Sequence, residues 1–133
     1  RCDLHSHSIH SDGSATPAEL VAMAKEQGLI IALTDHNTVS GLPDFLEEAE
    51  KSGVIAVGGT ELSCDYGDRE FHLLGLFVAP EHYESVEALV SKFYILKQNQ
   101  LFYPMHYVFR YLQYDRAFLL HKSMHSYEHT LYQ

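Results

Sequence analysis

Apolar and polar positions in the first part of the chain follow two alternating patterns. Residues 29–33 form a continuous apolar run, which is typical of a parallel strand buried on both faces. Between such runs, apolar residues recur every three or four positions, as they do in a helix with one buried face. This alternation predicts βα units. We expect strands at residues 2–4, 29–33, 54–57 and 70–77, with Gly58 and Gly59 letting the backbone pass close to a site after the third.

The two expected helices carry signals at both ends. Thr16 suits the N-cap of the first helix, with Pro17 at the first position and Glu19 placed to bond back to the cap. Gly28 and Gly53 suit the C-terminal ends of the first and second helices. The side chains expected to face the sheet are Leu20, Met23, Ala24 and Gln27 in the first helix and Leu42, Phe45, Leu46 and Ala49 in the second.

The pattern changes after residue 80, so we divide the chain into residues 1–80 and residues 81–133. Residues 81–98 have the apolar spacing of a helix, with acidic residues early. Further on, aromatic residues and histidines recur at helical spacing, namely Tyr103, Tyr107, Tyr111, Tyr114, His121, His125 and His129. We expect helices packed against the sheet or against a second copy in a homo-oligomer. A substrate-covering cap is the alternative.

Length and composition limit the class of protein. The 133 residues suffice for about one domain, whereas a complete βα-barrel has about 200 residues or more. The chain begins at Arg1 without a methionine, so we expect it to start within a longer product or after processing. No apolar run approaches the roughly 18 residues of a membrane span, and we expect a cytoplasmic protein. Cys2 and Cys64 suit reduced surroundings better than a disulfide framework.

Charge is distributed unevenly along the chain. Residues 1–91 carry 16 acidic and 4 basic side chains, whereas residues 92–133 carry 2 acidic and 5 basic ones, within a net charge of −9. An acidic body repels phosphate and disfavours nonspecific binding of a nucleic acid duplex. A phosphate site in this protein therefore requires concentrated positive charge, which bound divalent cations supply.

Histidines and carboxylates recur where the expected strands end, namely at His5, His7, Asp12, Asp35, His36, Glu61 and His72. Loops at one edge of an α/β sheet or barrel converge, so we expect these side chains to meet. Neutral imidazoles and carboxylates bind zinc, manganese and iron. The two oxygens of Glu61 can bridge two ions. His72 lies within an apolar run, so a structural role is the alternative to metal binding for this residue. The sequence predicts a metal site.

Four phrases at these positions resemble the motifs of the PHP family, named for its polymerase and histidinol phosphatase members. They are D-L-H-S-H-S-I-H-S-D-G, T-D-H-N, G-T-E-L-S and F-H-L-L-G-L, within residues 2–80. The resemblance implies an α/β fold comprising part of a distorted TIM-like (β/α)7 barrel with two or three divalent ions. The resemblance also implies a metal-dependent phosphoesterase that hydrolyses phosphate esters. The apolar spacing after residue 80 adds a mostly helical C-terminal segment to this expected fold.

The resemblance and the ligand chemistry together suggest a role for each residue. We expect His5, His7 and Glu61 to hold one ion, Asp12 and His36 a second, and Glu61 with His72 a third. Asp35 would orient the His36 ring without binding the ion itself. Arg69 would bind a phosphate, with an ordinary exposed turn residue as the alternative. A metal-bound hydroxide would attack the phosphorus. The substrate would be a small nucleotide or a nucleic acid end.

Two other functions remain open on the sequence. Later phrases of the PHP family, one with an alanine-histidine-proline pattern and one with a late aspartate and histidine, are absent from the chain. Their absence favours a non-catalytic metal-binding fragment or interaction module that retains the early motifs. A metallohydrolase acting on carbon–nitrogen bonds shares the His-x-His opening, but T-D-H-N favours the PHP family instead.

Overall fold

The computed structural model describes residues 1–66, 69–98 and 119–123, and it places the side chains of residues 1–64 and 70–92. A single mixed sheet is combined with three α-helices and one short 3₁₀ helix over these residues. The elements in chain order are β1 (Cys2–Ser6), α1 (Pro17–Gln27), β2 (Ile30–Leu33), α2 (Leu42–Ser52), β3 (Ala56–Tyr66), β4 (Arg69–Leu76), η1 (Pro80–His82), α3 (Tyr83–Gln98) and β5 (Leu119–Ser123).

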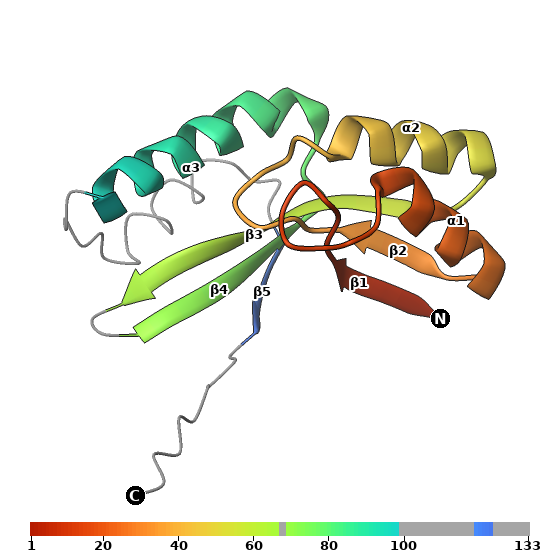
Figure 1. Cartoon of the computed structure of the whole chain (residues 1–133), viewed down its shortest axis with the longest axis horizontal. Coiled ribbons are helices and arrows are strands. Elements are labelled where there is room, and N and C mark those ends of the chain that lie inside the picture. Colours follow the sequence, from red (N-terminus) through yellow and green to blue (C-terminus); the bar gives the residue numbers. More distant parts are fainter. Residues whose placement is uncertain (67–68, 99–118, 124–133) are drawn as a thin grey trace, which may run out of the picture.

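The strands follow one another across the sheet in the order β1-β2-β3-β4-β5. β1, β2 and β3 are parallel, whereas β4 is antiparallel to both β3 and β5. α1 and α2 cover the parallel part of the sheet, and α3 lies over β3 and β4 (Figure 1). This α/β arrangement is a half-barrel in which the helices cover one face of a mixed sheet.

Local signals in the sequence place the helix ends where the structure has them. Thr16 and Glu19 form a complete capping box, and Pro17 begins α1. Gly28 and Gly53 end α1 and α2 with positive φ angles of 62° and 70°. The expected buried face of α1 was partly wrong, because Val21 is buried whereas Met23 and Gln27 are exposed.

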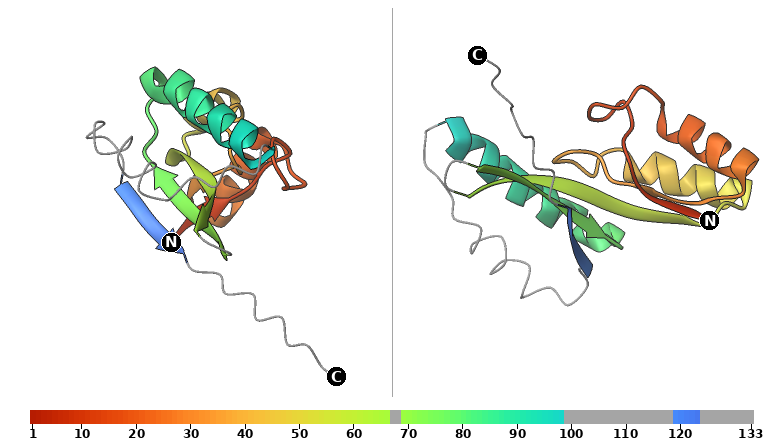
Figure 2. Two further views of the ribbon diagram at one scale, coloured as in Figure 1. Left: turned by 90° about the vertical axis from the view of Figure 1, so that its left-hand side faces the viewer. Right: turned by 90° about the horizontal axis from the view of Figure 1, so that it is seen from below.

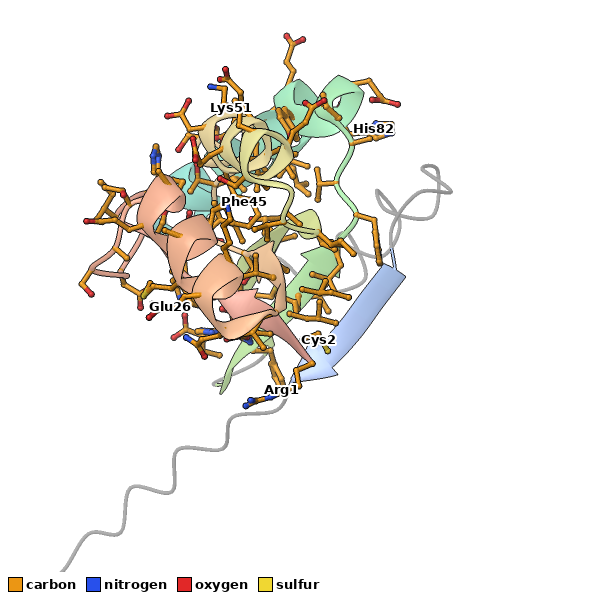
Figure 3. The ribbon with its side chains drawn as sticks, turned by 90° about the vertical axis from the view of Figure 1, so that its right-hand side faces the viewer. Arg1, Cys2, Glu26, Phe45, Lys51 and His82 are labelled. Atoms are coloured by element: carbon orange, nitrogen blue, oxygen red, sulfur yellow. The ribbon has the colours of Figure 1, made fainter. Side chains whose placement is uncertain are left out.

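Two apolar layers lie on opposite faces of the sheet. On the helix side, Phe45 is completely buried between α2 and the sheet (Figure 3). The core around it consists chiefly of Leu20, Val21, Ala24, Ile31, Leu33, Leu42 and Ala49. On the other face, Ala32, Leu74 and Leu76 form a separate cluster. Strand register places Glu61 opposite Leu74, so Glu61 lies on this helix-free face.

The structure lengthens the expected third strand and has the fourth strand within one residue of its expected place, at Arg69–Leu76. The backbone continues as a strand through Gly58 and Gly59, so Glu61 lies inside β3 and not in a loop after it. β4 returns directly and pairs along β3 from Tyr66↔Arg69 to Gly59↔Leu76. A turn this short cannot hold the crossover that a parallel strand requires. The βα alternation therefore ends at β3.

The second part of the chain contains the expected helix and one strand that the sequence did not predict. A helix begins at Tyr83 after a 3₁₀ turn and continues to Gln98, as the apolar spacing predicts. His121, however, lies in β5, where it pairs with Leu74, so the predicted helical row of histidines is wrong at this residue. The four tyrosines, His125 and His129 lie outside the described residues. Two further views show β5 at the edge of the sheet beyond β4 (Figure 2).

No helix within the described part of the chain has the length and apolar character needed to cross a membrane.

Candidate metal centre

The loops after β1 and β2 bring the predicted ligands together. The loop that follows β1 and the loop that follows β2 meet over the middle of β3 (Figure 1). His5 is in β1 and His7 comes directly after it, Asp12 is in the first loop, and His36 is in the second. His36 and Glu61 also form an isolated parallel bridge that extends the pairing of β2 with β3. Sheet pairing thus fixes the two segments that carry His36 and Glu61.

Glu61 is the centre of the cluster. Its side chain is 4% exposed, and Oε2 lies 2.7 Å from His5 Nε2, 3.2 Å from His7 Nε2 and 3.6 Å from His36 Nε2. The other oxygen, Oε1, lies 2.9 Å from His72 Nδ1. Four imidazoles therefore surround one buried carboxylate, and both carboxylate oxygens have a nitrogen neighbour.

Asp12 reaches the cluster from the solvent side. Its side chain is 69% exposed, and its two oxygens lie 3.5 Å from His7 Nδ1 and 3.7 Å from His36 Nε2. The rings of His7 and His36 stack with centroids 4.6 Å apart. Asp12 and Glu61 therefore approach this ring pair from the solvent side and from the buried strand.

The donor set fits divalent metal ions. Three groups of side chains could each hold an ion, because the donor atoms within each group lie within 4.8 Å of one another. They are His5 with His7 and Glu61, His7 with Asp12 and His36, and His36 with Glu61 and His72. Nδ1 of His7 and Nδ1 of His36 are buried without a hydrogen-bond partner among the described residues. The Nδ1 atom of His7 faces Asp12, and an imidazole nitrogen that makes no hydrogen bond can bind a metal in its unprotonated form. The structure brings all six predicted ligands together.

The surroundings of His7 and Glu61 favour the protonation states in which these residues bind metal. Burial and the charge of His36 lower the pKa of His7 despite the opposing effect of Glu61 and Asp12. Burial acts to raise the pKa of Glu61, but the hydrogen bond and charge of His5, with the charges of His36 and His72, outweigh it and lower that pKa. An unprotonated imidazole and an ionised carboxylate are the forms that bind metal.

Comparison with known proteins identifies the family. The family model of the PHP domain matches residues 3–131. The chain belongs to the PHP domain family. A 5'-3' exoribonuclease of Haemophilus influenzae is 36% identical over 91 residues, which cover 68% of this chain and 33% of that protein. A 3',5'-nucleoside bisphosphate phosphatase of Chromobacterium violaceum is 37% identical over 79 residues, which cover 59% of this chain and 28% of that protein.

A solved structure gives the same relationship. A Bifidobacterium adolescentis protein described as a candidate metal-dependent phosphoesterase has a TM-score of 0.63 and 32% identity, covering 68% of this chain and 32% of that one. This PHP domain thus spans about a third of the length of the curated relatives that it matches. The fold and family predicted from the four early motifs are confirmed.

Asp35 has a different place in this PHP domain from the one expected. Its carboxylate accepts hydrogen bonds from Ser8 N–H at 2.7 Å, Ser8 Oγ at 2.7 Å and Ser11 Oγ at 2.6 Å, and no hydrogen bond joins it to the His36 ring among the described side chains. The prediction that Asp35 fixes His36 was wrong in its target. Asp35 instead fixes the loop that carries Asp12.

Sequence reasoning missed three residues that support the centre. Ser8 and Ser11 hold Asp35, and Asn37 bonds to β3 next to Glu61. The signal for the serines was their position in a short turn rich in small polar residues, where hydroxyls bond locally. Arg69, the predicted phosphate clamp, begins β4, and its side chain lies outside the described part of the structure.

Proposed function

We propose that this PHP domain is the metal-binding part of a phosphoesterase that hydrolyses phosphate esters of small nucleotides or of nucleic acid ends. The observation that carries the proposal is the position of Glu61. One buried carboxylate meets four imidazoles within 3.6 Å. Clusters of titratable groups with shifted pKa values are typical of functional sites, and metal binding explains why these five side chains lie together.

The residues divide into three sets of ligands that share members. Glu61 belongs to two of the sets, as do His7 and His36, so we propose that these residues would hold two or three neighbouring divalent ions of manganese, zinc or iron. Bound divalent ions neutralise phosphate oxygens and acidify water. Asp12, the most exposed of the ligands, marks the side from which a substrate enters. The buried Glu61 holds the opposite side.

The proposed substrate class follows from the printed names of relatives and from charge. One relative is named an exoribonuclease and another a nucleoside bisphosphate phosphatase, so both names describe phosphate esters of nucleotides. The acidic body of this chain, with a net charge of −9, repels such anions at long range. Recognition of phosphate therefore depends on cations held by the six ligands, and we propose that Arg69 adds a contact to phosphate.

The second candidate is a non-catalytic metal-binding module. It is supported by the three ligand groups of the early motifs, which can hold metal ions without carrying out hydrolysis. In this alternative the early motifs bind metal and stabilise the half-barrel or form part of an interaction site. The two candidates differ in turnover and agree in metal binding.

Measurement of metal content and hydrolysis on the same preparation tests the proposal. The full chain would be loaded with manganese, zinc or iron and assayed on a nucleoside bisphosphate and on a short RNA, with and without chelator. We expect chelator-sensitive release of phosphate or nucleotide, and loss of at least about 100-fold in Glu61→Gln. Glu47→Gln is the matched control, because Glu47 is an exposed residue of α2 paired with Lys51.

Each outcome distinguishes the candidates. Metal bound by the unmodified chain without hydrolysis of either substrate would support the non-catalytic module. Hydrolysis that persists in chelator, or that Glu61→Gln leaves unchanged, would contradict the phosphoesterase mechanism. Arg69→Ala should raise KM more than it lowers kcat if Arg69 contacts the phosphate.

A further inference from the structure

Asn37 has an unusual backbone conformation directly after the ligand His36. Its φ angle is 53°, in the left-handed region. Asparagine is one of the few residues other than glycine that adopts this region readily. A left-handed residue interrupts the extended backbone of a strand. A residue in this conformation would normally end the pairing with the neighbouring strand.

The pairing with β3 nevertheless continues past this turn. Glu61 N–H donates to the Asp35 carbonyl at 3.1 Å, and Asn37 N–H donates to the Glu61 carbonyl at 2.8 Å. In a parallel ladder the next bond would join Ser63 N–H to the Asn37 carbonyl. Ser63 N–H donates instead to Oδ1 of the Asn37 side chain at 2.9 Å. The side-chain amide thus takes the place of a main-chain carbonyl.

The same amide makes a second contact with β3. Asn37 Nδ2 donates to Ser63 Oγ at 3.2 Å. Asn37 therefore bonds to β3 at Glu61 through its backbone and at Ser63 through both polar atoms of its side chain. Both sides of the Glu61 peptide are held, since its N–H and its carbonyl bond to the residues on either side of His36.

We propose that Asn37 is a positioning residue of the metal centre, which allows the chain to turn at His36 while its amide keeps Glu61 in register. This inference rests on the proposed metal-binding role of His36 and Glu61, whose Nε2 and Oε2 atoms lie 3.6 Å apart. Asn37 itself belongs to none of the three ligand groups. Its effect on metal binding is therefore carried through the backbone of the two ligands that it connects.

Substitutions of Asn37 separate the amide from the backbone conformation. Asn37→Gly keeps the left-handed turn without strain and removes the amide. Asn37→Asp keeps an oxygen acceptor for Ser63 N–H and tolerates the turn. Gly53→Ala is a control for left-handed strain alone, because Gly53 has φ of 70° and a Cβ there would meet no atom within 4 Å.

The experiment measures zinc affinity of the full chain by equilibrium dialysis in the absence of substrate. Residues that orient metal ligands affect affinity by about 10–100-fold, so we expect about tenfold weaker zinc binding in Asn37→Gly. We expect Asn37→Asp to remain within about threefold of the unmodified chain, since its acceptor is preserved. Gly53→Ala should bind zinc like the unmodified chain.

Amide hydrogen exchange of Ser63 in the metal-free protein provides a second measurement. Loss of its acceptor should make the exchange about tenfold faster in Asn37→Gly, whereas Asn37→Asp should preserve protection. Unchanged zinc affinity in Asn37→Gly would overturn the proposal, as would equal losses in Asn37→Gly and Gly53→Ala or an unmodified chain that binds no zinc. Zinc binding that follows the expected order without any hydrolysis would support the positioning role and reject the phosphoesterase.

Discussion

Glu61 and His72 contact each other diagonally across the β3–β4 hairpin. Register places Glu61 opposite Leu74 and His72 opposite Ser63, yet His72 Nδ1 lies 2.9 Å from Glu61 Oε1. Diagonal neighbours on one face of an antiparallel pair are within reach of long side chains. Two of the six predicted ligands are thus provided by one hairpin, in which the parallel βα pattern has already ended.

Removing different ligands should remove different numbers of ions. His72 belongs to one of the three donor groups, whereas Glu61 belongs to two. We expect His72→Ala to lose at most one ion per chain and Glu61→Gln to weaken two, because a carboxamide is a poorer ligand than a carboxylate. Elemental analysis of metal-loaded, dialysed protein measures both. Equal metal content in the two variants would show that the groups do not bind separately.

Loss of the Asp35 charge should destabilise the loop that carries Asp12. Three hydrogen bonds from Ser8 and Ser11 end on this buried carboxylate, and bonds to charged groups contribute about 1.5–3 kcal/mol each. We expect Asp35→Asn to lower the free energy of unfolding by about 1–3 kcal/mol, as measured by urea denaturation without metal. Asp44→Asn, on the exposed first turn of α2, should change it by less than about 1 kcal/mol.

A methyl group at Gly13 should displace the first metal-binding loop. A Cβ there would lie against the carbonyl oxygen of His7 and only 2.8 Å from the Ser8 nitrogen. These are backbone atoms that cannot rotate away, so Gly13→Ala should lower stability by about 1–3 kcal/mol and weaken metal binding. Gly28→Ala strains a left-handed residue in open space. It should lower stability and leave metal affinity unchanged, which dialysis can verify.

The lowered pKa of His7 predicts how the stability of the metal-free protein depends on pH. Burial and His36 favour the neutral ring in the folded state. The unfolded chain therefore protonates His7 first as the pH falls through about 6.5, and folding stability declines there. We expect His7→Gln to lose less stability than the unmodified chain between about pH 7.5 and 5.5. Parallel pH profiles from urea denaturation with chelator present would contradict this assignment.

Local sequence signals predicted the helix ends and the place where the ligands meet. Thr16, Pro17 and Glu19 act within one turn, and so do the glycines that end α1 and α2. The convergence of His5, His7, Asp12 and His36 follows from parallel strand topology, which periodicity indicates. These features depend on few residues and on short range, so the sequence determines them directly.

Features that depend on long-range pairing were not predicted. Glu61 is held in mid-strand by β4 and by the segment around His36, and no local pattern specifies either partner. The choice of Asp35 between His36 and the serine loop likewise depends on how two loops fold over each other. His121 lies in a strand although its spacing to other histidines fits a helix, because pairing with β4 overrides a weak periodic signal.

The position of β1 at the border of the described sheet has a consequence for how metal leaves. Within residues 1–66, 69–98 and 119–123, β1 pairs with β2 alone, whereas β2 and β3 each have neighbours on both sides. Strands with one neighbour open more readily than those with two. In a sheet in which β1 keeps this single neighbour, we expect metal dissociation to begin with movement of His5 and His7 together, while His36, Glu61 and His72 stay in place. The lifetime of bound ions would then depend on fraying of β1 as well as on the strength of the metal–ligand bonds.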